Sequence, residues 1–432
     1  MKKLFVIAAM AAIATGASAQ KSELSKARAA FDASSKVETY KTAEGKEAQR
    51  TVIVPEKLEE TKAMLAKAKE AWDATLAKGK EVKPEVIAMG YDIKGDLYQR
   101  IMGQELNHAA AKEPLDTMLF YTSLTDCLDA YEECYKNDEK GQYTAKNKSN
   151  LIKFRQYYMY CGQFFSQSGR NTKAAEAFKK WLDFPQRYTL VAGEESVIND
   201  PSFDRGMVSY YAALSLYQAK DYAGMAAFEK EALGYEKEAE NVRQLYLVSV
   251  QEQGDTARWE QMVRQYVKDG VASEGVIQNM MAHYFSSGKT DDVLAFAKDV
   301  EQYMPTNKMG GYAQGIVMMN QNKYDEAIAC FKRSLEIDPD YGDALYNIGV
   351  CLCNQGIALN SANVEKKFNS KAAAEAADEE ARKFFREAEP YFLRVQELMP
   401  DQPQRWAYRL QSIYTVLGNK EKQKEYEALA GE

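Results

Sequence analysis

Four short turns recur along this chain at a constant spacing, and this regularity restricts what the chain can fold into. The segments on both sides of each turn carry apolar residues at helical spacing. Helices of unrelated length would not keep one register, so the pattern predicts a repeat built from pairs of antiparallel helices. The turns lie at 219–222, 253–256, 287–290 and 321–324, so each begins 34 residues after the one before; similar turns occur at 168–171 and 417–420.

The clearest unit shows how such a helix pair would pack. Gly315 lies within the first helix and Ala327 near the start of the second, so two small residues allow the backbones to approach. Phe331 supplies bulk to fill the remaining gap. The second helix is expected to end at Asp338, because Pro339 cannot continue a helix and disfavours helical geometry at the residue before it. The Asp-Pro step is therefore the corner between one hairpin and the next.

At these positions the sequence resembles the tetratricopeptide repeat (TPR) family. The resemblance covers 155–186 and 206–426, and it implies an all-α fold: a right-handed superhelix, or solenoid, of stacked antiparallel helix hairpins. It is weaker where Glu229, Leu247 and Met281 replace the expected residue types. The matching residues are Gly315, Tyr324, Ala327, Phe331, Pro339, Tyr346, Gly349 and Leu352, and in a second unit Tyr158, Gly162, Phe165, Ala174, Phe178 and Pro185.

The rest of the chain is divided by composition and spacing. The stretch 35–54 has no sustained period and is expected to be a loop with one short extended segment, and 140–150 and 187–205 are expected to be surface loops. Between the units that begin at Gly342 and Pro403 the spacing is 61, so 27 residues are added, and their helix-forming composition predicts a projecting arm. The predicted divisions are a signal peptide at 1–19, an N-terminal helical segment with an irregular stretch at 20–82, divergent TPR-like hairpins at 83–205, and a TPR array at 206–432 with a helical arm near 357–387.

The first nineteen residues have the features of an export signal. Lys2 and Lys3 precede a short apolar run, and Ala17-Ser18-Ala19 is a typical cleavage site. We therefore expect an exported, periplasmic protein cleaved after Ala19. Removing the two lysines changes the net charge from −7 to −9. This acidic balance argues against nucleic acid as a partner, and no apolar run of the mature chain reaches the length of a membrane span.

We find no catalytic or metal-binding motif. His108 and His283 lie far apart and outside any ligand motif, and there is no phosphate loop or dinucleotide fingerprint. The six cysteines fall in apolar helical patterns typical of core residues, although a disulfide between Cys330 and Cys351 is possible. The sequence therefore predicts a protein that is not an enzyme and has no cofactor or bound metal.

Function is then expected on the concave face, which in repeats of this type is lined by the first helix of each hairpin. The outward positions of these helices are aromatic or amide residues with almost no cations, which disfavours the carboxylate clamp that some TPR proteins use. Tyrosine offers a rigid contact surface and amides can pair with a peptide backbone, although several of the tyrosines could instead pack between hairpins. The candidate partner-binding residues are Tyr160, Gln163, Tyr210, Tyr211, Gln244, Gln278, Asn279, Tyr312, Tyr346, Asn347 and Tyr408.

The predicted function is a periplasmic scaffold that binds protein or peptide partners through this face and through the arm. The alternative is a helical-repeat protein that binds glycans or small molecules in the cell envelope, because aromatic and amide faces also suit sugars. Tyr312 and Tyr346 occupy equivalent positions of adjacent units, so we expect their rings to lie side by side along one groove wall.

Overall fold

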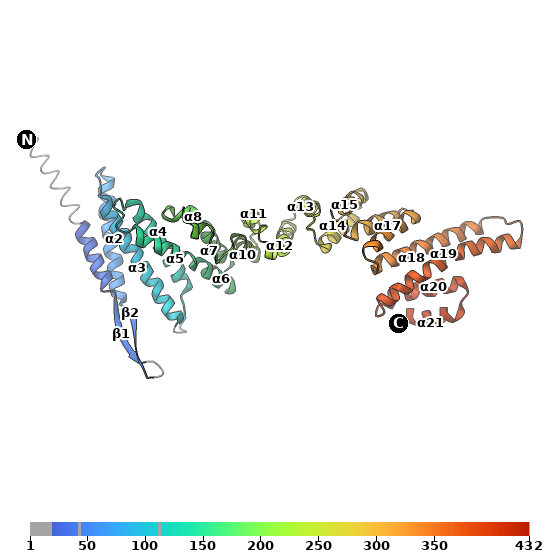
Figure 1. The fold of residues 1–432 in the computed structure, drawn as a ribbon, viewed down its shortest axis with the longest axis horizontal. Helices are drawn as coiled ribbons and strands as arrows, with labels where there is room; N and C mark the ends of the chain where they lie inside the picture. Colours follow the sequence, from blue (N-terminus) through green and yellow to red (C-terminus); the bar gives the residue numbers. More distant parts are fainter. Residues whose placement is uncertain (1–19, 42–44, 111–113, 432) are drawn as a thin grey trace, which may run out of the picture. The chain divides into compact units, whose positions relative to one another are not determined.

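A computed structural model describes residues 20–41, 45–110 and 114–431, and the predicted signal peptide lies outside these residues. The described residues divide into two compact units, with the boundary between Ser249 and Val250. Figure 1 labels their helices and strands. Within each unit the described residues are almost entirely helical, and neighbouring helices pair as antiparallel hairpins. The predicted all-α class, built from helix hairpins, is confirmed.

The first unit begins with a helix at 20–32, followed by a β-hairpin and two long helices. Strand β1 (Ser35–Lys41) pairs antiparallel with β2 (Glu47–Ile53). The prediction of a loop with one extended segment at 35–54 is therefore wrong: the β-branched residues of both halves pair into a sheet, whose base packs through Ile53 on the core. Helices α2 (Pro55–Ala77) and α3 (Pro84–Ala110) follow.

The remainder of the first unit is a series of helices that alternate with tight turns. The unit that begins at Gly206 departs from a regular hairpin, because its second half consists of two short segments, η2 and α11, and not of one helix. The elements are α4 (Thr117–Asn137), α5 (Thr144–Arg155), α6 (Tyr157–Gln167), α7 (Asn171–Leu182), α8 (Phe184–Arg187), η1 (Thr189–Val191), α9 (Glu195–Ile198), α10 (Arg205–Gln218), η2 (Gly224–Ala227), α11 (Glu229–Ala232), η3 (Glu236–Glu238) and α12 (Ala239–Glu252).

The segment 187–205 was expected to be a surface loop, but the structure shows that it is packed against the helices. Val191 and Val197 are buried in it. The buried carboxylate of Glu132 accepts hydrogen bonds from the backbone N–H groups of Thr189 (3.0 Å) and Leu190 (3.2 Å). Arg155, which is only 2% exposed, donates to the Val197 carbonyl at 2.6 Å. Long-range partners of this kind leave no periodic signal in the sequence.

The tract 140–150 was also expected to be a loop. Only its beginning is irregular, because α5 starts at Thr144. The carboxylate of Asp138 accepts hydrogen bonds from the backbone N–H groups of Gln142, Tyr143 and Thr144, which holds the turn in front of the helix. The polar composition that suggested a loop thus belongs to the first turns of a helix, where most side chains are exposed or half-buried and Asn147 is buried.

The second unit continues the alternation with fewer short helical segments. Its core joins buried residues of α17 to α20, including Phe331, Ile348 and Leu410. The elements are α13 (Thr256–Lys268), α14 (Glu274–Ser286), α15 (Thr290–Tyr303), α16 (Met309–Asn320), α17 (Tyr324–Ile337), α18 (Gly342–Val364), α19 (Lys371–Leu398), η4 (Pro403–Arg405), α20 (Ala407–Leu417) and α21 (Lys420–Ala430).

In four hairpins a glycine on the first helix faces an aromatic ring on the second. A Cβ added at Gly315 would lie 2.5 Å from the Phe331 ring, closer than real Cβ contacts. The missing side chain therefore lets the backbones approach, and the ring fills the space between them. The pairs are Gly95 with Tyr131, Gly162 with Phe178, Gly315 with Phe331, and Gly349 with Phe392.

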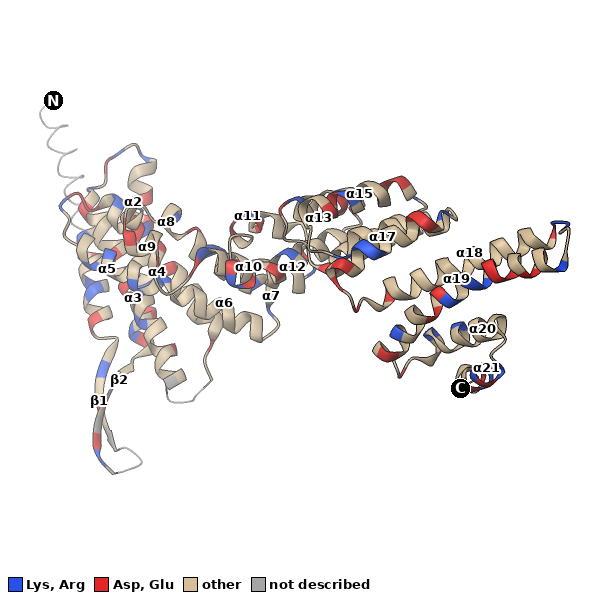
Figure 2. Cartoon of the chain, turned by 45° about the vertical axis from the view of Figure 1, so that its right-hand side comes forward, with Lys and Arg blue, Asp and Glu red and all other residues tan. Residues whose placement is uncertain are grey.

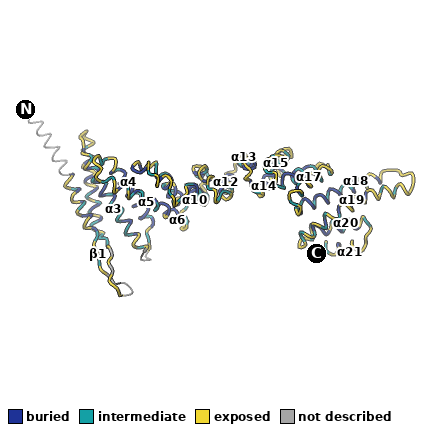
Figure 3. The backbone as a smooth tube through the Cα atoms, viewed as in Figure 1, coloured by how far each residue is buried: buried dark blue, intermediate teal, exposed yellow. Residues whose placement is uncertain are grey.

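The arm is formed by α18 and α19, which contain 23 and 28 residues. Gly349 and Phe392 are 43 positions apart, whereas Gly315 and Phe331 are 16 apart, and the difference equals the 27 inserted residues. Gly356 packs against Phe385, which repeats the same contact further along the arm. Beyond these contacts the arm is mostly exposed (Figure 3), and α19 carries charges of both signs (Figure 2).

All six cysteines lie in the described part of the chain as free, buried thiols, including Cys330 and Cys351. Burial raises the pKa of the Cys161 and Cys351 thiols to about 12. They behave as small apolar residues within helix contacts. Among the described residues no helix is both long and apolar enough to cross a membrane.

Candidate functional site

In the first unit the candidate residues divide into exposed and packed side chains. Tyr160 and Gln163 on α6 are exposed, and so is Gln244 on α12. Tyr210 and Tyr211 on α10 are half-buried, with ring centroids 5.6 Å apart. Tyr211 lies 6.2 Å from Phe178, and Tyr210 lies 6.2 Å from Tyr235, so these two tyrosines take part in packing between helices.

In the second unit a series of contacts joins the first helices of successive hairpins. On α14, Gln278 and Asn279 are exposed, and the Gln278 amide lies 3.9 Å from Met309 Sδ at the start of α16. The hydroxyl of Tyr341 lies 3.6 Å from the same sulfur. The ring of Tyr341 meets that of Tyr312 at 5.1 Å. Candidate residues from α14 and α16 are therefore parts of one continuous surface.

This surface continues onto α18 and α20. Asn347, only 8% exposed, donates through Nδ2 to the hydroxyl of Tyr312 at 3.3 Å. Its neighbour Tyr346 accepts a hydrogen bond from Nε of Arg409 at 3.1 Å. Tyr408, the preceding residue on α20, is 62% exposed. We call the side chains Gln278, Tyr312, Tyr346, Asn347 and Arg409 the tyrosine face.

The rings of Tyr312 and Tyr346 were expected to lie side by side, but each of them packs against other rings. Tyr312 packs against Phe331 (5.7 Å) and Tyr341, and Tyr346 packs against Phe392 at 5.6 Å. Burial raises the pKa of the Tyr312 hydroxyl. Both rings therefore contribute one side to the helix contacts and present the other to the surface. Each of these two tyrosines thus serves both packing and the surface, which the spacing of the repeat alone does not reveal.

The structure places three cations beside this surface that the reading of outward positions missed. The ammonium of Lys308 lies 4.6 Å from the Tyr341 ring centroid. It pairs with Asp338 at 2.9 Å and with Glu274 at 3.5 Å, and these hydrogen bonds and charges raise its pKa although burial opposes them. Arg405 pairs with Asp343. These carboxylates compensate the charges of Lys308 and Arg405.

Arg409 differs from the other two cations. Its guanidinium lies 5.6 Å from the Tyr346 ring centroid, and in the described part of the chain no carboxylate forms an ion pair with it. It follows Tyr408 directly on α20, but of these two residues only Tyr408 was among the outward positions read from the sequence. The tyrosine face therefore ends at an uncompensated positive charge.

Asn279 also lines a separate polar cavity of the second unit. The cavity measures about 570 Å³ and lies between α13, α14 and the end of α12. Trp259 and His283 form one wall, with ring centroids 5.6 Å apart. The other lining side chains are mostly amides and hydroxyls, namely Gln251, Thr256, Asn279 and Ser286. Next to the cavity, Glu260 Oε1 lies 3.0 Å from His283 Nε2.

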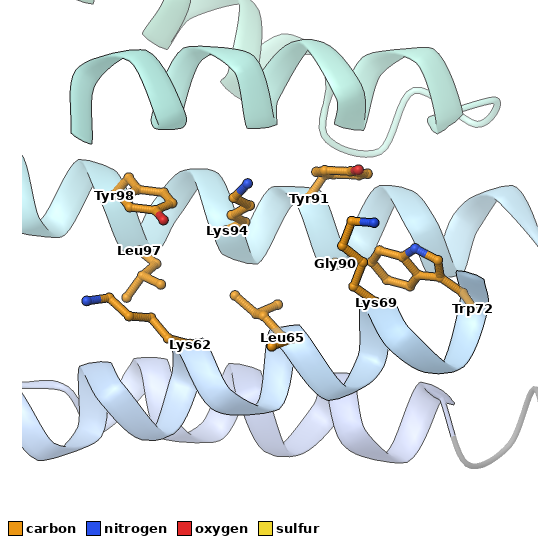
Figure 4. A pocket seen from close by; sticks show the side chains of 10 residues that line it. Lys62, Leu65, Lys69, Trp72, Gly90, Tyr91, Lys94, Leu97 and Tyr98 are labelled. Atoms are coloured by element: carbon orange, nitrogen blue, oxygen red, sulfur yellow. The ribbon is translucent and has the colours of Figure 1, made fainter. Parts of the chain in front are cut away.

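The first unit contains a groove between α2 and α3 that no candidate residue predicted (Figure 4). It measures about 220 Å³. Leu65 and Leu97 form an apolar floor, and Trp72 and Tyr91 close one end with ring centroids 6.0 Å apart. Lysine side chains lie around it, but Lys62 pairs with Glu59 and Lys69 with Asp73, so the local charge is largely compensated.

The arrangement on the tyrosine face supports noncovalent recognition. Amide, phenol and guanidinium groups can bind a peptide backbone or a carboxylate, whereas none of these groups is a nucleophile activated by a neighbouring base. Among the described residues no group of three or more His, Cys, Asp or Glu side chains is placed to hold a metal ion.

Comparison with known proteins gives one match in sequence and several in structure. Residues 317–356 match the sequence model of the TPR repeat, which confirms the predicted resemblance to that family. No curated protein matches the chain.

Three solved structures illustrate the similarity. The C-terminal part of a TPR repeat-containing protein from Cytophaga hutchinsonii is 12% identical, with a TM-score of 0.37, over 63% of this chain and 93% of that one. YrrB, described as a TPR protein with an unusual peptide-binding site, is 14% identical, with a TM-score of 0.29, over 49% of this chain and 94% of its own. PilW, described as a type IV pilus biogenesis factor, is 18% identical, with a TM-score of 0.31, over 52% of this chain and 90% of its own.

Proposed function

We propose that the protein is a non-enzymatic scaffold that binds an extended segment of a protein partner along the tyrosine face of its second unit. The observation that carries the proposal is the continuity of this face. Side-chain contacts link α14, α16 and α18, and the hydrogen bond from Arg409 to Tyr346 joins α20 to them. An extended peptide needs donors and acceptors at regular intervals, and the repeat supplies them at each first helix.

The exposed residues on and beside this face indicate how the partner would be held. Gln278 and Asn279 offer exposed amides at one end, and Tyr408 offers an exposed ring at the other. Rigid aromatic side chains of this kind are frequent energetic centres of protein interfaces. Arg409 would then meet an acidic group of the partner, because its hydrogen bond to Tyr346 holds the guanidinium in place and no carboxylate of the described chain compensates it.

The test is a comparison of variants in one binding assay. Partners would be isolated from the cell envelope with the wild-type protein, and their affinity measured by calorimetry. Arg409→Ala should weaken binding about tenfold or more, because hydrogen bonds to charged groups contribute about 1.5–3 kcal/mol. Lys424→Ala is the matched control, since Lys424 is exposed on α21 and away from the face. Equal losses in both variants would refute the assignment.

We further propose that the protein works in the periplasm after cleavage behind Ala19. The signal-like sequence at 1–19 supports this location. Cell fractionation, together with mass determination of the mature amino terminus, tests it: the mature chain should begin at Gln20. A chain that retains residues 1–19, or one found in the cytoplasmic fraction, would contradict the proposal.

The polar cavity beside Asn279 supports a second candidate function, the binding of a glycan. Its volume lies within the range of small-molecule sites, and Trp259 with the surrounding amides and hydroxyls could contact a neutral sugar. A glycan array probed with the wild type and with Asn279→Ala separates the two candidates. Sugar binding that depends on Asn279, without any protein partner that depends on Arg409, would favour the second candidate.

A further inference from the structure

The β-hairpin of the first unit has no partner among the described residues. Its sheet contains only β1 and β2, so each strand has one open edge. Figure 1 shows the hairpin extending away from the helices, and its base is anchored through Ile53. Two-stranded hairpins are marginally stable alone, and open strand edges are sites at which further strands add.

The register shows which backbone groups point to the open edge of β1. The N–H of Val54 donates to the Ser34 carbonyl at 2.8 Å, and the pairing continues from Ser35 with Ile53 to Lys41 with Glu47. In an antiparallel ladder, hydrogen-bonded and non-hydrogen-bonded pairs alternate. Lys36 and Glu38 therefore direct their backbone groups toward β2. The backbone N–H and C=O groups of alternate residues, Ser35, Val37 and Thr39, point outward.

The side chains along this edge are polar except at its centre. Val37 is 64% exposed, the second most exposed of the large apolar side chains in the described chain. Lys36 and Thr39 are exposed as well. The edge therefore presents unpaired backbone groups, a central apolar side chain and charges on either side of it, with Lys36 and Glu38 forming an ion pair at 2.7 Å within the strand.

We infer that β1 pairs antiparallel with β1 of a second copy of this chain, with Val37 on the two-fold axis. In this register Val37 lies opposite Val37 of the second copy, and Lys36 lies opposite Glu38 of the second copy, twice by symmetry. The outward backbone groups of Ser35, Val37 and Thr39 then all face one another, so roughly six backbone hydrogen bonds form. The result is a four-stranded antiparallel sheet.

Other registers of the same edge are less favourable. The outward backbone groups also meet when the axis passes through Lys36 or Glu38, but these registers place two lysines or two glutamates directly opposite each other. On the open edge of β2, no register centred on Gln49, Arg50 or Thr51 places opposite charges across from each other. The charge pattern thus selects both the strand and the register, which is why we favour a second copy over a strand from another protein.

Disulfide trapping tests the register directly. In the proposed pair, residues 37 of the two copies have Cα atoms about 5.5 Å apart, within the range of a disulfide. The two copies of residue 39 are offset by four positions along the strands, about 13 Å, and cannot be bridged. With the six native thiols buried, Val37→Cys should give covalent dimers under mild oxidation and Thr39→Cys should not. Equal trapping at both positions, or at neither, overturns the proposal.

The oligomeric state of the intact mature chain provides the second test, by light scattering over a range of concentrations. Val37→Pro removes an outward N–H but no bond of the hairpin itself, and it should convert dimers to monomers. Lys36→Glu places glutamates opposite each other and should raise the dimer dissociation constant about tenfold or more. A monomeric wild type, as expected if another protein supplies the strand, or a Val37→Pro variant that still dimerises, overturns the proposal.

A mixing experiment separates repulsion from misfolding. The variant Glu38→Lys with Arg50→Glu keeps residues of opposite charge at positions 38 and 50, which the backbone register pairs, but reverses their signs. It should fail to dimerise alone, because its lysines at 36 and 38 would face each other. Mixed with Lys36→Glu, it should form heterodimers, since every charge then meets its opposite. Absence of association in the mixture, with both variants folded by circular dichroism, contradicts the register.

Discussion

The contact between Gly315 and Phe331 predicts that a glycine-to-alanine substitution is destabilising there, although the same substitution is stabilising at an open helix position. An added Cβ at position 315 would lie 2.5 Å, 2.6 Å and 2.8 Å from three atoms of the Phe331 ring. The ring is fully buried and cannot move aside. Overpacking of this kind costs about 1–3 kcal/mol. Against it stands a gain of about 1 kcal/mol, because alanine favours helix over glycine.

Gly315→Ala should therefore lower the free energy of unfolding of the second unit by up to about 2 kcal/mol, whereas Gly103→Ala should raise it in the first unit. Gly103 also lies within a helix, α3, but a Cβ there would meet nothing within 4 Å. It is the matched control, since only the propensity gain applies to it. In a Phe331→Leu background, which removes the ring atoms beyond the δ carbons, the penalty at position 315 should become smaller.

Hydrogen exchange is the appropriate assay, because stability in repeat arrays is a local property of units and their interfaces. Protection of the α16 and α17 amides would be compared in the wild type, the single variants and the double variant. The reasoning would be refuted if Gly315→Ala increased protection as Gly103→Ala does. It would also be refuted if the effect of Gly315→Ala were the same with Phe331 and with leucine at that position.

Three further outcomes follow from the contacts described above. Arg155→Met should make the segment 187–205 sensitive to limited proteolysis, because the Val197 carbonyl loses its donor, whereas Arg170→Met, an exposed control, should not. Although burial opposes the shift, hydrogen bonds from His283 and Lys289 hold the pKa of Glu260 below its ordinary value. The contribution of Glu260 to stability is therefore present above about pH 4.5 and is lost as the pH falls through the lower pKa of the folded state. Glu260→Gln should accordingly make the melting temperature less dependent on pH at acidic pH. The buried thiols should react with an aromatic disulfide reagent at pH 8 only after unfolding, and rapid reaction of the native protein would contradict their placement.

The repeating part of the fold could be predicted because it is local. Gly162 and Gly315 each meet an aromatic ring 16 positions later, so one short sequence window contains both partners of the contact. The same contact persists across the arm between Gly349 and Phe392, and the inserted residues that separate them are strong helix formers. Periodicity and composition were therefore sufficient there.

The parts that the sequence did not predict depend on distant partners. The segment 187–205 is held by Glu132 and Arg155, which lie on α4 and α5, and its own composition indicated only a loop. The β-hairpin is too short and polar for a periodic signal, and its strands are recognisable only once paired. On the candidate site, the outward positions read from the sequence include Tyr408 but not Arg409, whose side chain points about 100° away around α20.

Photo-crosslinking from a single position is the most direct test of the central proposal. A photoreactive phenylalanine would replace Tyr408, which is 62% exposed on the first helix α20, or Tyr303, which is 40% exposed at the end of the second helix α15. Both positions lie in the second unit and both are tyrosines, so the two variants differ mainly in whether the photoreactive group lies on the first or the second helix of a hairpin. We predict that irradiated cells yield a defined adduct with a protein partner from position 408, which Arg409→Ala abolishes, and none from position 303. Adducts of equal yield from both positions, or from position 303 alone, would contradict the account.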